Sequence, residues 1–132
     1  MSDPITPPAA RWPSEAAELV SLAVSDGDLG AAVAQYEQAA ALHPWADQRP
    51  NGHTVTDTMA AIIRLRLPLD LRLVSVLTAD GLTMLVCERS IDGTGPDGEP
   101  VRLRGLGCTV VRPQDDGSWR IAADVWQLAE PA

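Results

Sequence analysis

The end of the chain holds the residue best suited to acid–base chemistry. Residues 115–126 read DDGSWRIAADVW, and the side chains after the turn alternate with the two-residue period of a β-strand. This alternation places Asp124 and Trp126 on one face of the strand. A carboxylate on such a face is suited to take a proton from the carbon next to a carbonyl group and to return it. We interpret Asp124 as a candidate general acid or base. The alternatives are a structural carboxylate paired with Arg120 or Arg104, and a solvated strand residue on a face that meets water.

A second group of residues has the chemistry of a pocket wall or a proton carrier. His43 precedes Pro44, and an imidazole exchanges a proton near neutral pH, so we consider it as an assisting acid or base; the alternative is a histidine that only binds loop carbonyl groups. Aromatic and thioether side chains give apolar walls, and a phenol gives a hydrogen-bond donor. The predicted substrate-binding residues are therefore Tyr36, Trp45, Trp126 and Met59, each of which is equally typical of ordinary core packing.

The overall charge excludes several classes of partner. The net charge is −8, and the ten basic residues are all arginines that form no basic stripe. Nucleic-acid binding is therefore not expected, because it needs a basic surface. Apolar runs are too short for a membrane helix, and the N-terminus shows no signal-peptide pattern. We expect a cytoplasmic protein with no membrane contact.

Cofactor and metal motifs are not apparent in the sequence. Cys87 and Cys108 with the two histidines have no zinc-ligand spacing, and neither a P-loop nor a G-x-G-x-x-G motif is present. The prediction is a protein without metal or cofactor.

The positioning elements are predicted to be helices first and strands afterwards. Residues 1–13 contain four prolines and predict an extended arm, with Trp12 as its expected anchor. Helices are predicted at residues 14–25, 28–41 and 57–65, from their capping residues and apolar periodicity. Strands are predicted at residues 69–78, 82–91, 101–112 and 119–128, separated by turns rich in glycine. This order predicts one α+β domain over residues 14–132, with three N-terminal helices packed on an antiparallel sheet.

Both faces of the predicted strands are apolar. Leu103 and Val111 alternate with Leu106, Cys108 and Val110 along one of them. A sheet covered by helices on one side only would show a cleaner division. We therefore predict a homodimer joined through the sheet, because large apolar patches are seldom left exposed; the alternative is a core that covers both faces within one chain.

The order of these pieces resembles the nuclear transport factor 2-like superfamily, in its branch of SnoaL-like polyketide cyclases and ketosteroid isomerases. The resemblance covers roughly residues 14–128. It depends on the segment Asp26-Gly27-Asp28-Leu29, on Tyr36, on the turn 94–100 (TGPDGEP) and on Gly117-Ser118-Trp119-Arg120-Ile121. It implies a cone-shaped cavity between the helices and the concave face of a curved sheet.

The resemblance also bears on activity. The positions of the ketosteroid isomerase tyrosine and aspartates fall here near Val20, at His43 or Pro44, and at Thr109, so the usual oxyanion-hole pair is absent. In SnoaL-like cyclases the acid–base aspartate lies on the last strand, seven residues after a turn glycine, and Asp124 stands seven residues after Gly117.

We therefore predict a cofactor-independent acid–base enzyme of the isomerase, cyclase or dehydratase type, acting on a small apolar metabolite that contains a carbonyl group. One alternative is a non-catalytic ligand-binding or dimerisation module of the same fold. A further alternative is an epoxide hydrolase of the limonene type, which normally needs a second aspartate beside an arginine.

Overall fold

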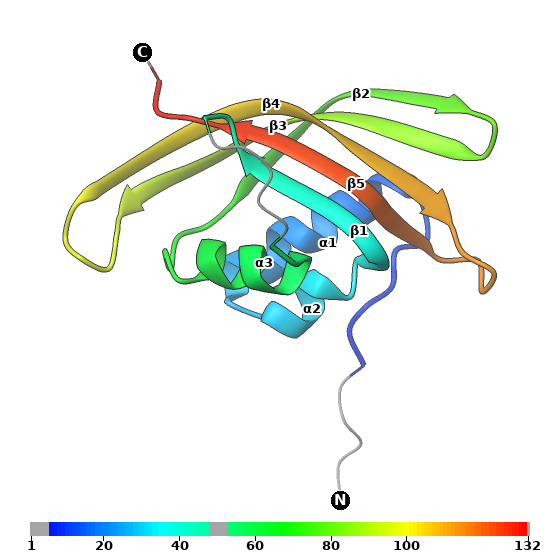
Figure 1. Ribbon diagram of the computed structural model, residues 1–132, viewed down its shortest axis with the longest axis horizontal. Helices are drawn as coiled ribbons and strands as arrows, with labels where there is room; N and C mark the ends of the chain where they lie inside the picture. Colours follow the sequence, from blue (N-terminus) through cyan, green and yellow to red (C-terminus); the bar gives the residue numbers. More distant parts are fainter. Residues whose placement is uncertain (1–5, 48–52, 132) are drawn as a thin grey trace, which may run out of the picture.

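The protein consists of a curved sheet with helices under one of its faces (Figure 1). The computed structural model describes residues 6–47 and 53–131. Within these ranges the element order is α1, α2, β1, α3 and then β2 to β5, and the five strands form one sheet in the order β1-β5-β4-β3-β2. This is the α+β layout predicted from the sequence, with one strand more than expected.

The helices begin and end at recognisable capping residues. Helix α1 (Pro13–Asp26) has proline in its first turn and ends at Gly27, whose φ of 72° is in the left-handed region that favours glycine. Asp28 caps the short helix α2 (Leu29–Val33) by accepting a hydrogen bond from the Ala31 amide. Thr54 does the same for helix α3 (Val55–Ile63) through the Asp57 amide.

The four predicted strands are confirmed, with small differences at their ends. Strand β2 (Asp70–Ala79) and strand β3 (Leu82–Thr94) form a hairpin around the predicted turn at Asp80 and Gly81. Strand β4 (Pro100–Pro113) pairs antiparallel with β3, and strand β5 (Trp119–Leu128) pairs antiparallel with β4. Two-residue periodicity and glycine-containing turns were sufficient to locate all four.

The predicted helix over residues 28–41 was wrong in its second half. The helix ends at Val33, and Tyr36–Trp45 is strand β1, which pairs in parallel with β5. The segment YEQAAAL contains good helix formers, so its local preference favours a helix. Pairing with the edge of β5 and burial of Tyr36 against the sheet override that preference.

The predicted N-terminal arm is extended over its described part, residues 6–12; residues 1–5 lie outside the described ranges. Its anchor is Ala10, which is fully buried and accepts a hydrogen bond from the Trp119 amide. Pro8 adds a second tether, since its carbonyl accepts a hydrogen bond from the side chain of Gln35 at 2.7 Å. Trp12, the expected anchor, is instead exposed and stacks with Arg11.

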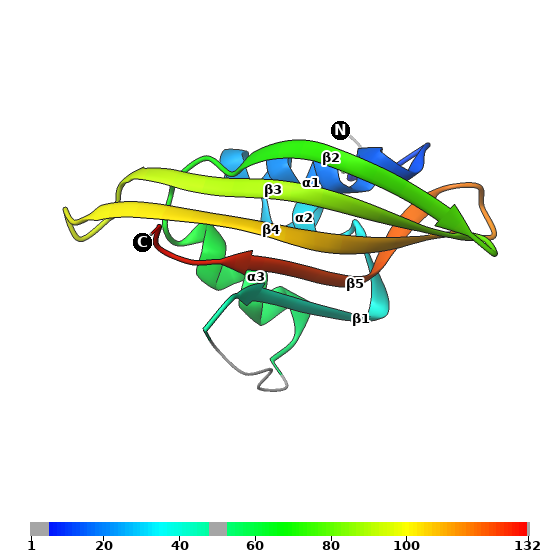
Figure 2. The ribbon, with the colours of Figure 1, turned by 90° about the horizontal axis from the view of Figure 1, so that it is seen from above.

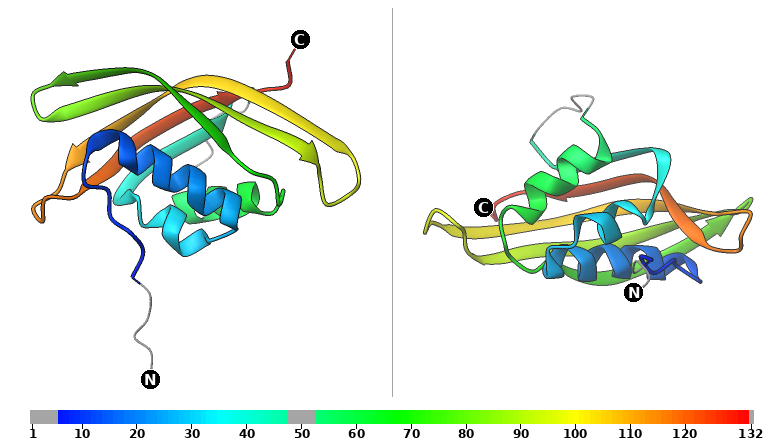
Figure 3. Two further views of the ribbon diagram at one scale, coloured as in Figure 1. Left: turned by 180° about the vertical axis from the view of Figure 1, so that it is seen from behind. Right: turned by 90° about the horizontal axis from the view of Figure 1, so that it is seen from below.

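The two faces of the sheet differ in what covers them. The helices and the sheet enclose the apolar core, to which Val20, Met59, Leu85 and Ile121 belong, and Figure 3 shows the helices from behind and from below. Seen from the other side, the sheet has no described element lying over it (Figure 2). The core therefore lies on one side of the sheet only. Side chains on this inner face of the sheet are the candidates for function.

Candidate functional site

Asp124 faces the interior of the protein. Its residue is 2% exposed, and its carboxylate accepts two short hydrogen bonds. The Tyr36 hydroxyl donates to Oδ2 at 2.6 Å, and the Thr109 hydroxyl donates to Oδ1 at 2.6 Å. Hydrogen bonds to a carboxylate are stronger than those between neutral groups. The side chain is therefore held in one orientation by residues of β1 and β4.

A buried arginine completes the surroundings of this carboxylate. Arg89 of β3 is 1% exposed, and its Nη2 donates to Thr109 Oγ1 at 2.9 Å. The same Nη2 lies 3.8 Å from Asp124 Oδ1, so the two charges form a buried ion pair with Thr109 beside it. Such a pair is electrically balanced, and removing either partner would leave an uncompensated buried charge.

Trp126 lies against the arginine. The Arg89 guanidinium carbon is 4.8 Å from the centre of the indole ring, within the range of a cation–π contact. Both side chains keep a buried N–H group without a partner among the described residues, Nη1 of Arg89 and Nε1 of Trp126. Buried donors in proteins are normally paired, so these two are exceptions that need a physical reason.

A close approach of the neighbouring strands β4 and β5 positions Asp124 and Trp126. A Cβ atom at Gly107 of β4 would lie 1.9 Å from the Val125 carbonyl oxygen, and one at Gly105 would lie 2.2 Å from the Trp126 carbonyl oxygen. Only glycine admits so close an approach of two backbones. Glycine on β4 therefore allows β5 to bring its carboxylate and indole over the inner face.

Tyr36 is held in its neutral form. Burial raises the pKa of the Tyr36 phenol well above its ordinary value of 10.0, and the charge and hydrogen bond of Asp124 raise it further. The phenol therefore remains a donor to Asp124 across the physiological pH range. Cys87 lies in the same buried cluster, where burial raises the pKa of its thiol while Arg89 opposes that effect.

A hollow adjoins this cluster on the side of Tyr36. It has a volume of about 420 Å³ and lies between the start of β1 and the start of α3; its lining comprises Val33, residues 36–40 and residues 54–56. Tyr36 thus contacts the hollow and also binds Asp124, whereas Asp124 itself is not part of the lining. Tyr36 is therefore the residue that belongs both to the lining of the hollow and to the surroundings of Asp124.

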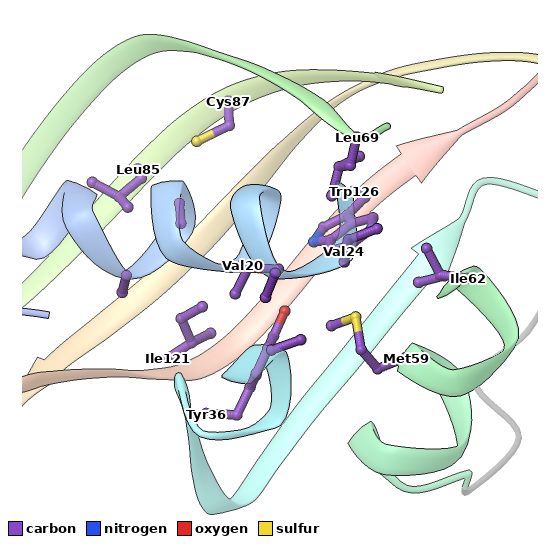
Figure 4. Close-up of a cluster of buried hydrophobic side chains, with 14 of the residues drawn as sticks. Val20, Val24, Tyr36, Met59, Ile62, Leu69, Leu85, Cys87, Ile121 and Trp126 are labelled. Atoms are coloured by element: carbon purple, nitrogen blue, oxygen red, sulfur yellow. The ribbon is translucent and has the colours of Figure 1, made fainter. Parts of the chain in front are cut away.

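The other predicted site residues fall in different places. Met59 and Trp126 are fully buried, and in Figure 4 the Met59 side chain points from α3 toward Tyr36 and Trp126. Trp45, at the end of β1, is half-buried at the edge of the core. In the β1–β5 register His43 is beside Val125, while Leu42 is beside Asp124. Because neighbouring strand residues point to opposite faces, the structure does not bring His43 to the carboxylate.

Two residues of the cluster, Arg89 and Thr109, were not predicted from the sequence to be partners of Asp124. The arginine that pairs with Asp124 is Arg89, and neither Arg104 nor Arg120, both of which are exposed. Arg89 occupies an inward position between Cys87 and Ile91 on β3. An arginine within an apolar two-residue stripe was the available signal. Thr109 has no local sequence signal for this role, because threonine is common in strands.

Within residues 6–47 and 53–131, no group of three or more His, Cys, Asp and Glu side chains is placed to hold a metal ion. No helix of the described residues is long and apolar enough to span a membrane.

Comparison with solved structures identifies the fold. A ketosteroid isomerase-like protein from Erwinia carotovora atroseptica superposes with a TM-score of 0.69 at 16% identity, over 89% of this chain and 94% of its own. An NTF2-like protein of unknown function from Shewanella oneidensis gives a TM-score of 0.66 at 18% identity, over 86% and 93% of the two chains. The protein therefore has the NTF2-like fold, as the resemblance in its sequence implied.

A third structure has the same fold and a more specific description. It is named as a candidate dehydratase of the NTF2-like family, from Streptomyces avermitilis, with a TM-score of 0.66 at 15% identity over 89% of this chain and 94% of its own. No protein-family model matches the chain, and no curated protein matches it. At these identities the likeness establishes the fold, and the chemistry must be argued from the residues.

Proposed function

We propose that the protein is a cofactor-independent acid–base enzyme of the isomerase, cyclase or dehydratase type, in the SnoaL-like and ketosteroid isomerase-like branch. Its substrate is a small apolar metabolite with a carbonyl group. The observation that supports this most directly is the inward, 2% exposed carboxylate of Asp124, held by Tyr36 and Thr109. A carboxylate fixed in a water-poor environment is the arrangement that reversible proton transfer at carbon requires.

In this proposal the residues have separate roles. Asp124 removes a proton from the carbon next to the carbonyl group and returns it to the same or a neighbouring position. Tyr36 and Thr109 orient the carboxylate through hydrogen bonds at 2.6 Å each, and Arg89 balances its charge. Tyr36, Met59 and Trp126 form the wall on which an apolar substrate packs, with Trp45 at its edge. His43 has no part in this scheme, because it points to the other face of the sheet.

The experiment is proton–deuterium exchange at the carbon next to the carbonyl of a probe ketone, 1-indanone, followed by NMR in D₂O. The protein is expected to accelerate exchange, and Asp124→Asn is expected to lower the rate by about 100-fold or more, which is the usual contribution of a positioned acid or base. Asp92→Asn is the matched control, because Asp92 is an exposed strand carboxylate facing Arg102. A folded Asp124→Asn protein with unchanged exchange rules out the role of Asp124.

The second candidate is a non-catalytic ligand-binding or dimerisation module. It is favoured by the fact that Asp124 has two hydrogen-bond donors and an ion-pair partner and does not line the described hollow. This candidate predicts that the wild-type protein binds apolar molecules but gives no exchange above the buffer rate. The epoxide hydrolase alternative is less favoured, because no second carboxylate joins the described Arg89–Asp124 pair.

We also propose that two chains associate through the uncovered face of the sheet. Outward positions on four adjacent strands carry exposed apolar side chains, namely Leu77, Leu82, Met84, Leu106 and Val125. This outer apolar face has Arg72 and Glu88 at one side, paired at 2.7 Å. A second copy of the chain would remove these side chains from water, which is the main driving force for association.

A further inference from the structure

We propose that Nη1 of Arg89 and Nε1 of Trp126 form the binding site for the carbonyl oxygen of a neutral ligand. The inference rests on the proposed function and adds to it the group that would hold the substrate's oxygen. The resemblance to ketosteroid isomerases places their usual oxyanion-hole pair at about Val20 and at Thr109, so that pair is absent here.

Both donor groups, Nη1 of Arg89 and Nε1 of Trp126, are buried. Arg89 is 1% exposed and Trp126 is 0% exposed, and neither Nη1 nor Nε1 has a hydrogen-bond partner among the described residues. A buried N–H without an acceptor costs free energy, so the protein keeps two such groups at a cost to its stability. An acceptor that arrives with a ligand gives a reason for this cost.

The two donors lie in the same buried region as Asp124. Arg89 uses its other terminal nitrogen, Nη2, for Thr109 and Asp124, so Nη1 is left for a different acceptor. Trp126 is two residues from Asp124 on the same face of β5 and lies against the guanidinium at 4.8 Å. In Figure 4 its indole nitrogen points into the buried cluster, toward the side of Val20 and the Tyr36 hydroxyl. A base and two free donors therefore occupy one region of the core.

The buried ion pair favours a ligand without a net charge. Arg89 and Asp124 carry opposite charges and compensate each other. A ligand carboxylate would add an uncompensated negative charge to this buried region, whereas a carbonyl oxygen would not. A carbonyl oxygen also gains negative charge when the neighbouring carbon loses its proton to Asp124. Fixed donors at that oxygen would then stabilise the transition state most strongly.

Space for the ligand could come from the hollow beside Tyr36 together with movement of the Met59 side chain. The hollow of about 420 Å³ reaches Tyr36, and the Met59 side chain points from α3 toward Tyr36 and Trp126. Methionine is flexible and readily changes its conformation. A ligand that displaces the Met59 side chain from this place would gain access to the donors.

The test compares three molecules of similar shape: 1-indanone, the hydrocarbon indane and indane-1-carboxylate. Binding is measured by titration in ¹H–¹⁵N NMR spectra, with the indole signal of Trp126 assigned by its loss in Trp126→Phe. We expect the ketone to bind at least about ten-fold more tightly than indane, and to shift the indole proton as a new hydrogen bond does. The carboxylate is expected to bind more weakly than the ketone.

Two variants separate the donors from the rest of the pocket. Trp126→Phe keeps an aromatic ring and removes no hydrogen bond present in the free protein, so it should fold and should lose several-fold of the preference for the ketone over indane. Arg89→Lys keeps the charge beside Asp124 and should lower the same preference. Met59→Ala makes space without altering a donor, so it should strengthen the binding of both molecules and leave their ratio unchanged.

The proposal is overturned if the ketone and indane bind equally, if neither binds even to Met59→Ala, or if Trp126→Phe leaves the preference intact. Tighter binding of the carboxylate also contradicts it, as does an ordered water that stays on both nitrogens when the ketone is bound. These outcomes are independent of catalysis. Ketone preference without proton exchange would keep the oxygen site and refute the enzyme, and exchange without preference would do the reverse.

Discussion

At the scale of single residues, Tyr36 has the most informative environment. Its hydroxyl donates a hydrogen bond to Asp124, the residue belongs to the lining of the hollow, and burial raises the pKa of the phenol well above 10.0. An unfolded tyrosine ionises near pH 10, whereas the folded one keeps its proton to a higher pH. Between these two pKa values only the unfolded chain has lost the proton. The contribution of Tyr36 to stability is therefore complete below about pH 10 and is lost as the pH rises above it.

This linkage predicts a spectroscopic result. Tyr36 is the only tyrosine of the chain, so the ultraviolet absorbance of phenolate reports on it alone. In a rising pH titration, phenolate should appear together with the loss of circular dichroism and not before it. Phenolate that forms near pH 10 in a fully folded protein would contradict the buried hydrogen bond to Asp124.

Tyr36→Phe is the matching change in the protein. It removes a hydrogen bond to a buried carboxylate, and we expect a loss of about 1.5–3 kcal/mol in the free energy of unfolding at neutral pH. The difference between wild type and variant should narrow above about pH 10, where the wild type loses its advantage. Urea titrations at a series of pH values measure both effects, and a constant difference at all pH values would argue against the raised pKa.

At the scale of the elements, the close approach of the paired strands β4 and β5 determines where Asp124 lies. The Cβ of Gly107→Ala would meet the Val125 carbonyl oxygen at 1.9 Å, and backbone atoms give way only if the strand moves. We expect a loss of at least about 2 kcal/mol in the free energy of unfolding, measured by urea denaturation.

Gly30→Ala is the control for this change. Its Cβ would meet no atom closer than Asp28 Oδ1 at 3.8 Å, and alanine is the better helix former, so stability should be unchanged or slightly higher. If Gly107→Ala were as stable as this control, the close approach of β4 and β5 would not be present in solution.

At the scale of the whole molecule, the outer apolar face is the surface through which we propose that two chains associate. If two chains meet there, Leu106→Glu places a carboxylate in the interface, since Leu106 is 54% exposed on that face. Sedimentation velocity should show a dimer for the wild type and a monomer for this variant. Leu22→Glu is the control, because Leu22 is 60% exposed on helix α1 and lies away from the face. A monomeric wild type would refute the dimer.

The sequence by itself determined the α+β class and the four strands from β2 to β5. These features depend on local signals: a two-residue period of apolar side chains, glycine in the turns and capping residues before helices. Strict alternation along β5 would place Ile121 and Asp124 on opposite faces, yet both are buried. A register shift opposite Val110 and Val111 of β4 leaves Ala122 as an extra residue of β5 between them, so the folded sheet decided the inward direction of Asp124.

Only the tertiary structure decided the fate of β1 and the partners of the carboxylate. The segment Tyr36–Trp45 prefers a helix locally and becomes a strand through parallel pairing with β5, a contact between residues about 85 positions apart. That pairing brings Tyr36 to Asp124 and turns His43 away from it. Likewise Arg89 and Thr109 reach the carboxylate from two further strands. Partners from separate strands are chosen by sheet register, and register is a property of the folded molecule that no local pattern contains.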